Sequence, residues 1–223
     1  EAVEKVLEKY FSKKGEDIVQ NNINAVEIGK VTGVKLKDEH QINFAIESDS
    51  SIEEELLING NEAVAMGAMN GGCNFMSFYP MSPGTGVATF FAQHSNEMEL
   101  VVEQAEDEIA AINMAIGAWY AGARAMITTS GGGYALMNEG LSLSGVTETP
   151  VVFHIGQRPG PGTGLPTRMA QEDLLFALFG GHGEFPRIIL APGDLQDGYL
   201  LGKKAFQLAD KYQAPVFILT VQY

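Results

Sequence analysis

Three consecutive carboxylates, Glu106, Asp107 and Glu108, form the part of this sequence best suited to acid–base chemistry. They follow an apolar run at residues 100–102 and precede a long segment of small and apolar residues. This pattern predicts a buried strand, then acidic residues in a first helical turn, then a helix that is apolar nearly all round. Acidic residues suit a helix N-terminus because its free N–H groups and dipole favour negative charge. Alternatively, one carboxylate points into a cleft, where burial changes its proton chemistry.

The chain from about residue 58 alternates short apolar segments with helical patterns. The apolar segments lack polar alternation, which is typical of parallel strands covered by helices on both sides. We therefore predict an α/β fold with a mainly parallel sheet of about six strands, near the usual sheet size, and helices on both faces. The expected strands are residues 75–79, 100–102, 125–129, 150–155, 187–191 and 216–220. One expected helix ends near residue 91, and the others cover about 107–121, 135–143, 171–179 and 195–212.

The loops of unusual composition all follow strands in this pattern. Ligands of open parallel sheets bind at the loops beyond the carboxyl ends of the strands, so these loops are expected at one edge of the sheet. They cover residues 80–86, 104–108, 130–133 and 156–168. Their shared edge predicts a site that does not depend on any single motif.

The chain before residue 58 has a different composition. Residues 1–29 show two apolar series at helical spacing, which end near Gly15 and Gly29, and they are predicted to be helical. Residues 30–57 contain few core residues and an acidic, serine-rich run, so they are predicted to be a linker. Because the first residue is Glu1 and not Met, we interpret the sequence as a mature or excised piece.

Composition excludes several classes of function. The net charge of −14 argues against binding to a phosphate backbone, which requires clustered Lys and Arg. The apolar runs are strand-length, so no transmembrane segment is expected. The single cysteine, Cys73, cannot form an internal disulfide or hold an iron–sulfur cluster, and we interpret it as a small structural residue.

Common nucleotide and hydrolase motifs are not completed. Gly84-Thr85-Gly86 follows a strand, but position 89 is not the glycine that the dinucleotide pattern requires. No Walker A motif occurs, and Thr128 stands where a nucleophile elbow around Ser130 would need glycine. The glycines of these loops either let the backbone approach a ligand or another subunit, or form only tight turns.

Basic side chains supply further candidates. The histidines lack metal-ligand spacing, so no metal site is predicted; His154 reads as a core histidine, and His182 lies on a flexible loop that could reach a site. Arg158 and Arg168 lie in the loop after the strand at 150–155. Each could hold a carboxylate through two parallel hydrogen bonds, or could form a structural salt bridge that ties down the loop.

Short motifs occur along the chain in the order Gly60-Asn61-Glu62-Ala63, Tyr79-Pro80-Met81-Ser82-Pro83, Gln104-Ala105-Glu106-Asp107-Glu108-Ile109-Ala110-Ala111-Ile112-Asn113-Met114, Thr129-Ser130-Gly131, Thr147-Glu148-Thr149-Pro150, Gln157-Arg158-Pro159-Gly160-Pro161, Gly164-Leu165-Pro166-Thr167-Arg168 and Gly181-His182-Gly183-Glu184-Phe185-Pro186-Arg187. Together they closely resemble the alpha subunit of 2-oxoacid:ferredoxin oxidoreductases, particularly of the 2-oxoglutarate type. The resemblance covers about residues 59–223. It implies that residues 58–223 form a thiamine diphosphate domain of the pyrimidine-binding type. Residues 1–29 resemble the helical tail of a gamma domain that many members carry ahead of alpha.

The resemblance implies chemistry based on thiamine diphosphate shared with a partner subunit. Glu108 matches the family glutamate that hydrogen-bonds the ring nitrogen of the aminopyrimidine, and it lies nine residues before Gly117, as in the wider thiamine-enzyme pattern. The site interpretation is therefore favoured for Glu108 alone among the clustered carboxylates. Ser130 and Gly131 are further cofactor-binding candidates. Mg²⁺ and the iron–sulfur cluster would belong to the partner subunit.

The same resemblance implies positions that hold the 2-oxoacid. Ser82 would bind it through a hydroxyl and Arg158 through its guanidinium, with Tyr79 and Arg168 as further substrate-binding candidates. Ser82 replaces the usual threonine but keeps the hydroxyl, and Val221 replaces a usual aspartate with a consequence that the sequence does not define.

The implied reaction is oxidative decarboxylation of a 2-oxoacid, in the first place 2-oxoglutarate, to an acyl-CoA with reduction of ferredoxin. Pyruvate or a branched-chain 2-oxoacid is the alternative substrate, and a non-catalytic scaffold that keeps the fold is the alternative role. The expected partners are the beta subunit, in a hetero-oligomer with a dimeric core, ferredoxin and coenzyme A, with no nucleic acid and no membrane. The expected location is cytoplasmic, and the chain alone is expected to be inactive.

Overall fold

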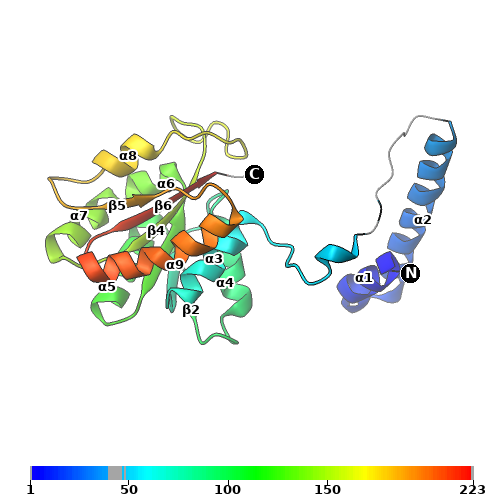
Figure 1. The fold of residues 1–223 in the computed structure, drawn as a ribbon, viewed down its shortest axis with the longest axis horizontal. Helices are drawn as coiled ribbons and strands as arrows, with labels where there is room; N and C mark the ends of the chain where they lie inside the picture. Colours follow the sequence, from blue (N-terminus) through cyan, green and yellow to red (C-terminus); the bar gives the residue numbers. More distant parts are fainter. Residues whose placement is uncertain (1, 40–46, 48, 222–223) are drawn as a thin grey trace. The chain divides into compact units, whose positions relative to one another are not determined.

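The computed structural model describes residues 2–39, 47 and 49–221. The chain divides into two compact units, Glu1–Glu55 and Leu56–Tyr223 (Figure 1). In the first unit, helix α1 (Ala2–Phe11) and helix α2 (Glu16–Asp38) pack against each other through a short 3₁₀ turn, η1 (Ser12–Lys14), and a second 3₁₀ turn, η2 (Ser50–Ile52), follows. Neither α1 nor α2 contains a buried residue.

Helix α2 continues beyond the point where the sequence predicted a linker. We expected helical structure to end at Gly29, but residues 30–38 are helical. Ion pairs from Lys30 to Glu27 and from Lys35 to Glu39, at helical spacing, accompany this extension. Residues 30–38 of the predicted linker are therefore helical, and residues 40–46 and 48 lie outside the described residues.

The second unit is built on a six-stranded sheet in the order β2-β1-β3-β4-β6-β5. Every neighbouring pair of strands is parallel. The strands are β1 (Phe75–Phe78), β2 (Val101–Gln104), β3 (Ala125–Thr129), β4 (Val152–Gln157), β5 (Ile188–Leu190) and β6 (Val216–Val221). The predicted α/β fold with a parallel sheet of about six strands is confirmed.

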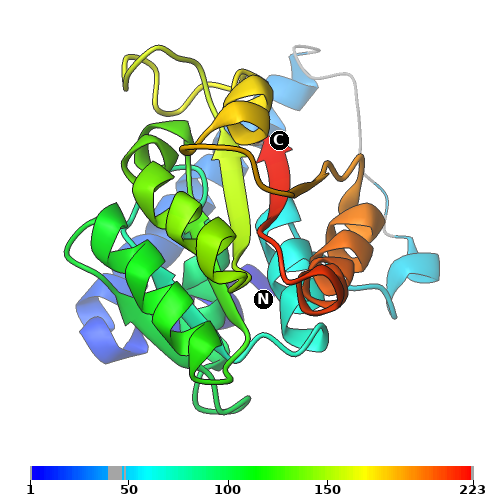
Figure 2. The same ribbon diagram turned by 90° about the vertical axis from the view of Figure 1, so that its left-hand side faces the viewer.

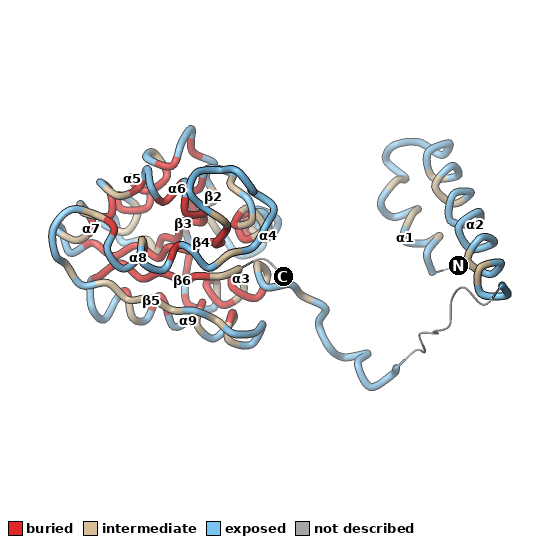
Figure 3. The backbone as a smooth tube through the Cα atoms, turned by 90° about the horizontal axis from the view of Figure 1, so that it is seen from above, coloured by how far each residue is buried: buried red, intermediate tan, exposed pale blue. Residues whose placement is uncertain are grey.

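Helices cover both faces of the sheet, and each face has its own apolar core (Figure 2). One core packs beneath α3 (Gly60–Asn70), α4 (Thr85–His94) and α9 (Leu195–Tyr212). The other core packs beneath α5 (Glu108–Tyr120), α6 (Gly131–Leu136), α7 (Asn138–Thr147) and α8 (Leu174–Phe179). Burial is concentrated in the central strands between these layers (Figure 3).

Helix α3 was not predicted from the sequence. Its start carries a capping box, in which Asn59 and Glu62 each accept a hydrogen bond from the other's main-chain N–H. Helices α3 and α9 then pack closely because glycines line their contact: a Cβ on Gly67 would overlap the carbonyl of Tyr199, and one on Gly202 would lie 2.8 Å from the carbonyl of Val64.

The strand before the acidic cluster is not buried as predicted. Val101, in β2, is 52% exposed, because β2 is an edge strand that pairs only with β1. An apolar run in sequence does not distinguish a central strand from an edge strand, since that distinction depends on the order of the strands. Among the described residues, none of the helices is both long enough and apolar enough to cross a lipid bilayer.

Candidate functional site

Glu108 is placed by the start of α5. Asp107 is the N-cap of this helix, and its carboxylate accepts a hydrogen bond of 2.7 Å from the N–H of Ala110. Asp107 therefore caps the helix from outside its first turn, and Glu106 lies before it and is exposed. Glu108 is the first helical residue, and its side chain turns inward and is only 4% exposed.

The carboxyl group of Glu108 lies against α6. A Cβ added to Gly133 would lie 2.9 Å from Glu108 Oε1 and would overlap the hydroxyl of Thr129. Glycine at 133 therefore leaves the space that the carboxyl group occupies. Within the described part of the chain, the structure gives the Glu108 carboxylate neither a hydrogen bond nor an ion pair. A buried carboxylate without a protein partner is available to a ligand.

Ser130 and Gly131 form the junction between β3 and α6, and both are buried. The hydroxyl of Ser130 is fully enclosed without a hydrogen-bond partner among the described residues. Gly131 adjoins the carboxyl group of Asp173, which a Cβ at 131 would overlap. The turn therefore lies beside Glu108 on one side and beside the loop that follows β4 on the other.

Arg158 directly follows β4 and is 5% exposed. Its Nη1 donates a hydrogen bond of 2.9 Å to the carbonyl of Ser82, and its Nη2 donates one of 3.4 Å to the hydroxyl of Thr163. These bonds leave further guanidinium N–H groups for a ligand carboxylate. Arg158 thus joins two of the predicted loops, and its structural contact is to a main-chain carbonyl where the sequence suggested a salt bridge.

The other substrate-binding candidates are more open. Tyr79 and Ser82 lie in the exposed turn after β1, and Tyr79 is 39% exposed. Ser82 is brought next to Arg158 by the bond to its carbonyl. Arg168 lies in the exposed part of the loop after β4, where its main-chain N–H donates to the carbonyl of Leu165. The structure therefore unites Ser82 and Arg158 but does not bring Arg168 to them.

Asp173 is a buried residue of this region that the sequence did not single out. Its N–H donates to Gln157 Oε1 at 3.3 Å, and its carboxylate accepts a hydrogen bond from the N–H of Arg158. Nearby, Glu172 accepts a bond of 2.7 Å from the N–H of Gly160, so the base of the loop after β4 is closed. Burial raises the pKa of Asp173 above its usual value. A single Asp in a loop carries no sequence signal for this role.

His154 and His182 lie in different surroundings. His154 is fully buried and hydrogen-bonded on both ring nitrogens, as a core histidine would be, and burial lowers its pKa to about 4. His182 contacts α7 through a hydrogen bond from its N–H to Ser142 Oγ. The described residues contain no group of three or more His, Cys, Asp and Glu side chains that could hold a metal ion.

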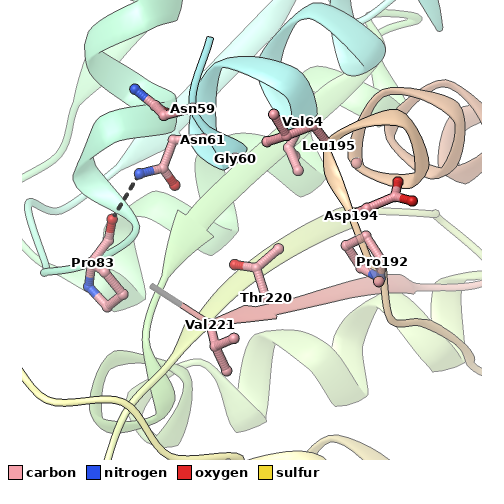
Figure 4. A pocket seen from close by; sticks show the side chains of 12 residues that line it. Asn59, Gly60, Asn61, Val64, Pro83, Pro192, Asp194, Leu195, Thr220 and Val221 are labelled. Carbon is pink, nitrogen blue, oxygen red and sulfur yellow. Dashed lines mark hydrogen bonds between the residues drawn. The ribbon is translucent and has the colours of Figure 1, made fainter. Parts of the chain in front are cut away.

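A hollow of about 690 Å³ adjoins the Ser82 loop on the α3 side of the sheet (Figure 4). Its walls come from the first turns of α3 and α9 and from the end of β6, with Asn61, Pro83 and Thr220 among the residues that line it. The carboxyl edge of the sheet therefore carries Glu108 on one face and this hollow on the other.

The fold and this edge define a class of protein: a parallel α/β domain that offers a buried, unpartnered carboxylate beside a glycine-lined turn. Residues 66–223 match the family described as pyruvate flavodoxin/ferredoxin oxidoreductase, thiamine diphosphate-binding. The chain belongs to this family.

Named relatives agree with this assignment. The chain is 42% identical over 205 residues to the alpha subunit of 2-oxoacid:ferredoxin oxidoreductase 1 from Sulfurisphaera tokodaii, covering 85% of this chain and 33% of that protein. It is 44% identical over 164 residues to the 2-oxoglutarate synthase subunit KorA from Archaeoglobus fulgidus, covering 74% of this chain and 47% of that protein. The chain thus spans between a third and a half of the length of these relatives.

One solved structure agrees with the family assignment, and a second shows likeness of fold. The 2-oxoglutarate:ferredoxin oxidoreductase from Magnetococcus marinus, whose structure holds 2-oxoglutarate, coenzyme A and succinyl-CoA, matches with a TM-score of 0.80 and 39% identity. That match covers 98% of this chain and 38% of the other. A split-gene transketolase matches with a TM-score of 0.51 at 14% identity over 73% of this chain and 50% of the other, which shows likeness of fold alone.

Proposed function

We propose that this chain supplies the aminopyrimidine half of the thiamine diphosphate site in a 2-oxoacid:ferredoxin oxidoreductase. The observation that carries the proposal is Glu108, a residue that is only 4% exposed and whose carboxyl group has no protein partner in the described part of the chain. A carboxylate that the protein leaves without a partner keeps its hydrogen-bonding capacity for a ligand. A ring nitrogen of the cofactor that shares a proton with this carboxylate would use that capacity.

The residues around Glu108 fit an aromatic ring held by one carboxyl group. Gly133 lets the Glu108 carboxyl group lie close against α6, and the exposed flank of α6 at Gly132 has only ordinary contacts. When bound, thiamine diphosphate supplies a carbon that attacks the 2-oxo group and takes up the electrons after decarboxylation. Glu108 would hold a proton between its Oε atom and the aminopyrimidine ring, and Ser130 and Gly131 are the further cofactor-binding residues that we propose in the adjoining turn.

The substrate side of the proposal rests on Arg158 and Ser82. A guanidinium that is already fixed by Ser82 and Thr163 loses little freedom when it binds a carboxylate. The 2-oxoacid carboxylate would pair with Arg158, and the Ser82 hydroxyl would donate to it, with Tyr79 and Arg168 nearer the solvent. We propose 2-oxoglutarate as the substrate because the relatives from Archaeoglobus fulgidus and Magnetococcus marinus are named for it.

The remaining parts of the proposed enzyme lie outside this chain. A beta subunit would hold the diphosphate, its Mg²⁺ and an iron–sulfur cluster, and the electrons would pass to ferredoxin with the acyl group going to coenzyme A. Both named relatives are subunits of larger enzymes, which supports a hetero-oligomer. The single cysteine, Cys73, is buried, and it cannot by itself ligate a cluster. We place the complex in the cytoplasm.

The direct test is Glu108→Gln in the reconstituted complex, with Glu106→Gln as the matched control. Loss of the proton-holding carboxylate should lower kcat by about 10²–10⁴-fold, whereas the exposed neighbour Glu106 should be dispensable. The variants are compared by turnover on a panel of 2-oxoacids, together with circular dichroism to show that both fold. Full activity of Glu108→Gln would contradict the proposal, and the preferred 2-oxoacid of the wild-type complex decides the substrate.

A further inference from the structure

The turn that carries Ser82 is held by its main-chain carbonyls. Beyond the guanidinium bond to Ser82 described above, the carbonyl of Gly84 accepts a hydrogen bond of 2.8 Å from Thr128 Oγ1. The carbonyl of Pro83 accepts a longer bond of 3.5 Å from Asn61 Nδ2 (Figure 4). The Pro83 ring also rests on β4, where a Cβ added to Gly156 would lie 2.8 Å from its Cγ. Side chains from several elements thus fix consecutive carbonyls of one exposed turn.

The bond from Thr128 is the end of a buried chain across the sheet. Strands β3 and β4 pair in a register that sets Thr128 beside His154, and Thr128 Oγ1 lies 2.8 Å from His154 Nδ1. The other ring nitrogen, Nε2, lies 2.8 Å from Thr220 Oγ1 in β6. Thr128 and His154 are both at most 2% exposed, while Thr220 reaches the wall of the hollow described above (Figure 4).

The hydrogen bonds determine which atoms carry the protons. Thr128 has a single O–H, and the carbonyl of Gly84 can only accept, so this proton points to Gly84. His154 Nδ1 must then donate to Thr128, and in a neutral ring Nε2 accepts from Thr220. This assignment requires a neutral imidazole, which agrees with the pKa of about 4 that burial gives His154.

We propose that Thr128 and His154 are positioning residues that set the place of the Ser82 hydroxyl through the carbonyl of Gly84. This inference rests on the proposed function, because it is Ser82 that is proposed to meet the 2-oxoacid. Neither side chain is exposed enough to touch a substrate. Their effect on substrate binding must therefore pass through the turn.

Two successive residues at the end of β3 make contacts on opposite faces of the sheet. Thr128 and Thr129 point to opposite faces because side chains alternate along a strand. Thr128 faces the α3 side and bonds to the carbonyl of Gly84, whereas Thr129 faces α6 beside Glu108 and Gly133 and its hydroxyl contacts Met81 Sδ at 4.0 Å. The end of β3 therefore fixes the proposed substrate turn and the proposed cofactor carboxylate relative to each other.

The test is Thr128→Val, with Thr128→Ser as the rescuing variant and Thr149→Val as the control. Thr149 is also buried, but its hydroxyl bonds to Thr147 at the opposite edge of the sheet. Deuterium exchange of residues 79–87 is measured in the full chain, and KM and kcat for the 2-oxoacid in the reconstituted complex. Thr128→Val should speed exchange and raise KM, each about tenfold, with kcat changed much less. Thr128→Ser should restore both, and Thr149→Val should change neither.

The outcomes separate this inference from the proposed function. Unchanged deuterium exchange of residues 79–87 in Thr128→Val would show that Thr128 does not hold the Ser82 turn, whatever the chain catalyses. Faster exchange with an unchanged KM would show that Thr128 holds the turn but does not affect binding of the 2-oxoacid. If the wild-type complex turned over no 2-oxoacid, the proposed function would be contradicted, and so would the effect of Thr128 on substrate binding. The exchange result would still show whether Thr128 holds the Ser82 turn.

The wild-type protein gives a second test if Thr128→Val does not fold. Nitrogen-15 spectra of the His154 ring report which nitrogen is protonated. We expect the neutral tautomer with the proton on Nδ1 at neutral pH. The opposite tautomer would direct the Thr128 proton to the imidazole and away from Gly84, and it would overturn the inference.

Discussion

His154 couples the charge of one buried side chain to folding. Its pKa of about 4 in the folded chain lies below the ordinary value of 6.5 because burial disfavours the charged imidazole. The unfolded chain therefore binds the proton more readily. The stability that His154 contributes is complete above pH 6.5 and is lost as the pH falls towards about 4.

We predict that wild type loses about 2 kcal/mol more unfolding free energy than His154→Gln between about pH 7.5 and about pH 5. Urea unfolding at the two pH values measures the difference. Asp173, whose raised pKa has the opposite effect on stability, contributes equally to both proteins and cancels. Identical pH dependence of the two proteins would show that His154 is not buried as a neutral ring.

Arg158 combines a structural bond to Ser82 with a proposed ionic bond to the substrate. Lysine keeps the charge but loses the planar fork, so Arg158→Lys should raise KM for the 2-oxoacid by about 10–100-fold. Arg187→Lys is the matched control, because Arg187 also donates Nη1 to main-chain carbonyls, those of Ala177 and Gly180. Steady-state kinetics of the complex check both, and an unchanged KM in Arg158→Lys would leave Arg158 a purely structural role.

Single residues also show where sequence reasoning reached its limit. The acidic cluster was correctly expected at a helix start, although Asp107 is the cap and not a helical residue, and Glu108 was singled out by family resemblance. The Thr128–His154–Thr220 chain could not be foreseen, because it depends on the pairing of β3, β4 and β6. His154 was correctly interpreted as a core histidine, but its partners lie far from it in the sequence.

At the scale of whole elements, helix α6 packs against the side chain of Glu108. Its glycines differ sharply in their surroundings: a Cβ at Gly133 would overlap Thr129 and crowd Glu108, whereas one at Gly132 would meet atoms no closer than 3.6 Å. The contact between α5 and α6 therefore depends on the absence of one side-chain atom.

We predict that Gly133→Ala destabilises the chain by about 1–3 kcal/mol, because the added methyl group must displace a buried neighbour. Gly132→Ala should be neutral or stabilise by up to about 1 kcal/mol, since alanine favours a helix. Chemical denaturation measures both. Equal effects of the two substitutions would mean that α6 does not pack against Glu108 as described.

The bounds of the buried strands were predicted more reliably than the exposure of the edge strand or the length of the exposed helix. Buried parallel strands are continuous apolar runs, which is why segments such as 125–129 and 216–220 were placed within a residue of their final bounds. The exposure of β2 and the extension of α2 were missed, because the first depends on strand order and the second on ion pairs of a solvent-exposed helix.

At the scale of the whole molecule, the chain covers only part of the site that we propose. Glu108, Ser130 and Gly131 would meet one end of the cofactor, and nothing in this chain is assigned to its diphosphate. We predict that thiamine diphosphate and Mg²⁺ bind measurably only after the beta subunit is added. Isothermal titration of the chain with and without that subunit checks this, and tight binding by the chain alone would contradict it.

The most direct test of the central claim is the rate at which the hydrogen on the thiazolium C2 of bound thiamine diphosphate exchanges with deuterium in the assembled complex. If Glu108 holds the proton on the aminopyrimidine, Glu108→Gln should slow this exchange by about 10²–10⁴-fold with the cofactor still bound. Glu106→Gln should exchange at the wild-type rate. An undiminished rate in Glu108→Gln would show that this buried carboxylate does not activate the cofactor.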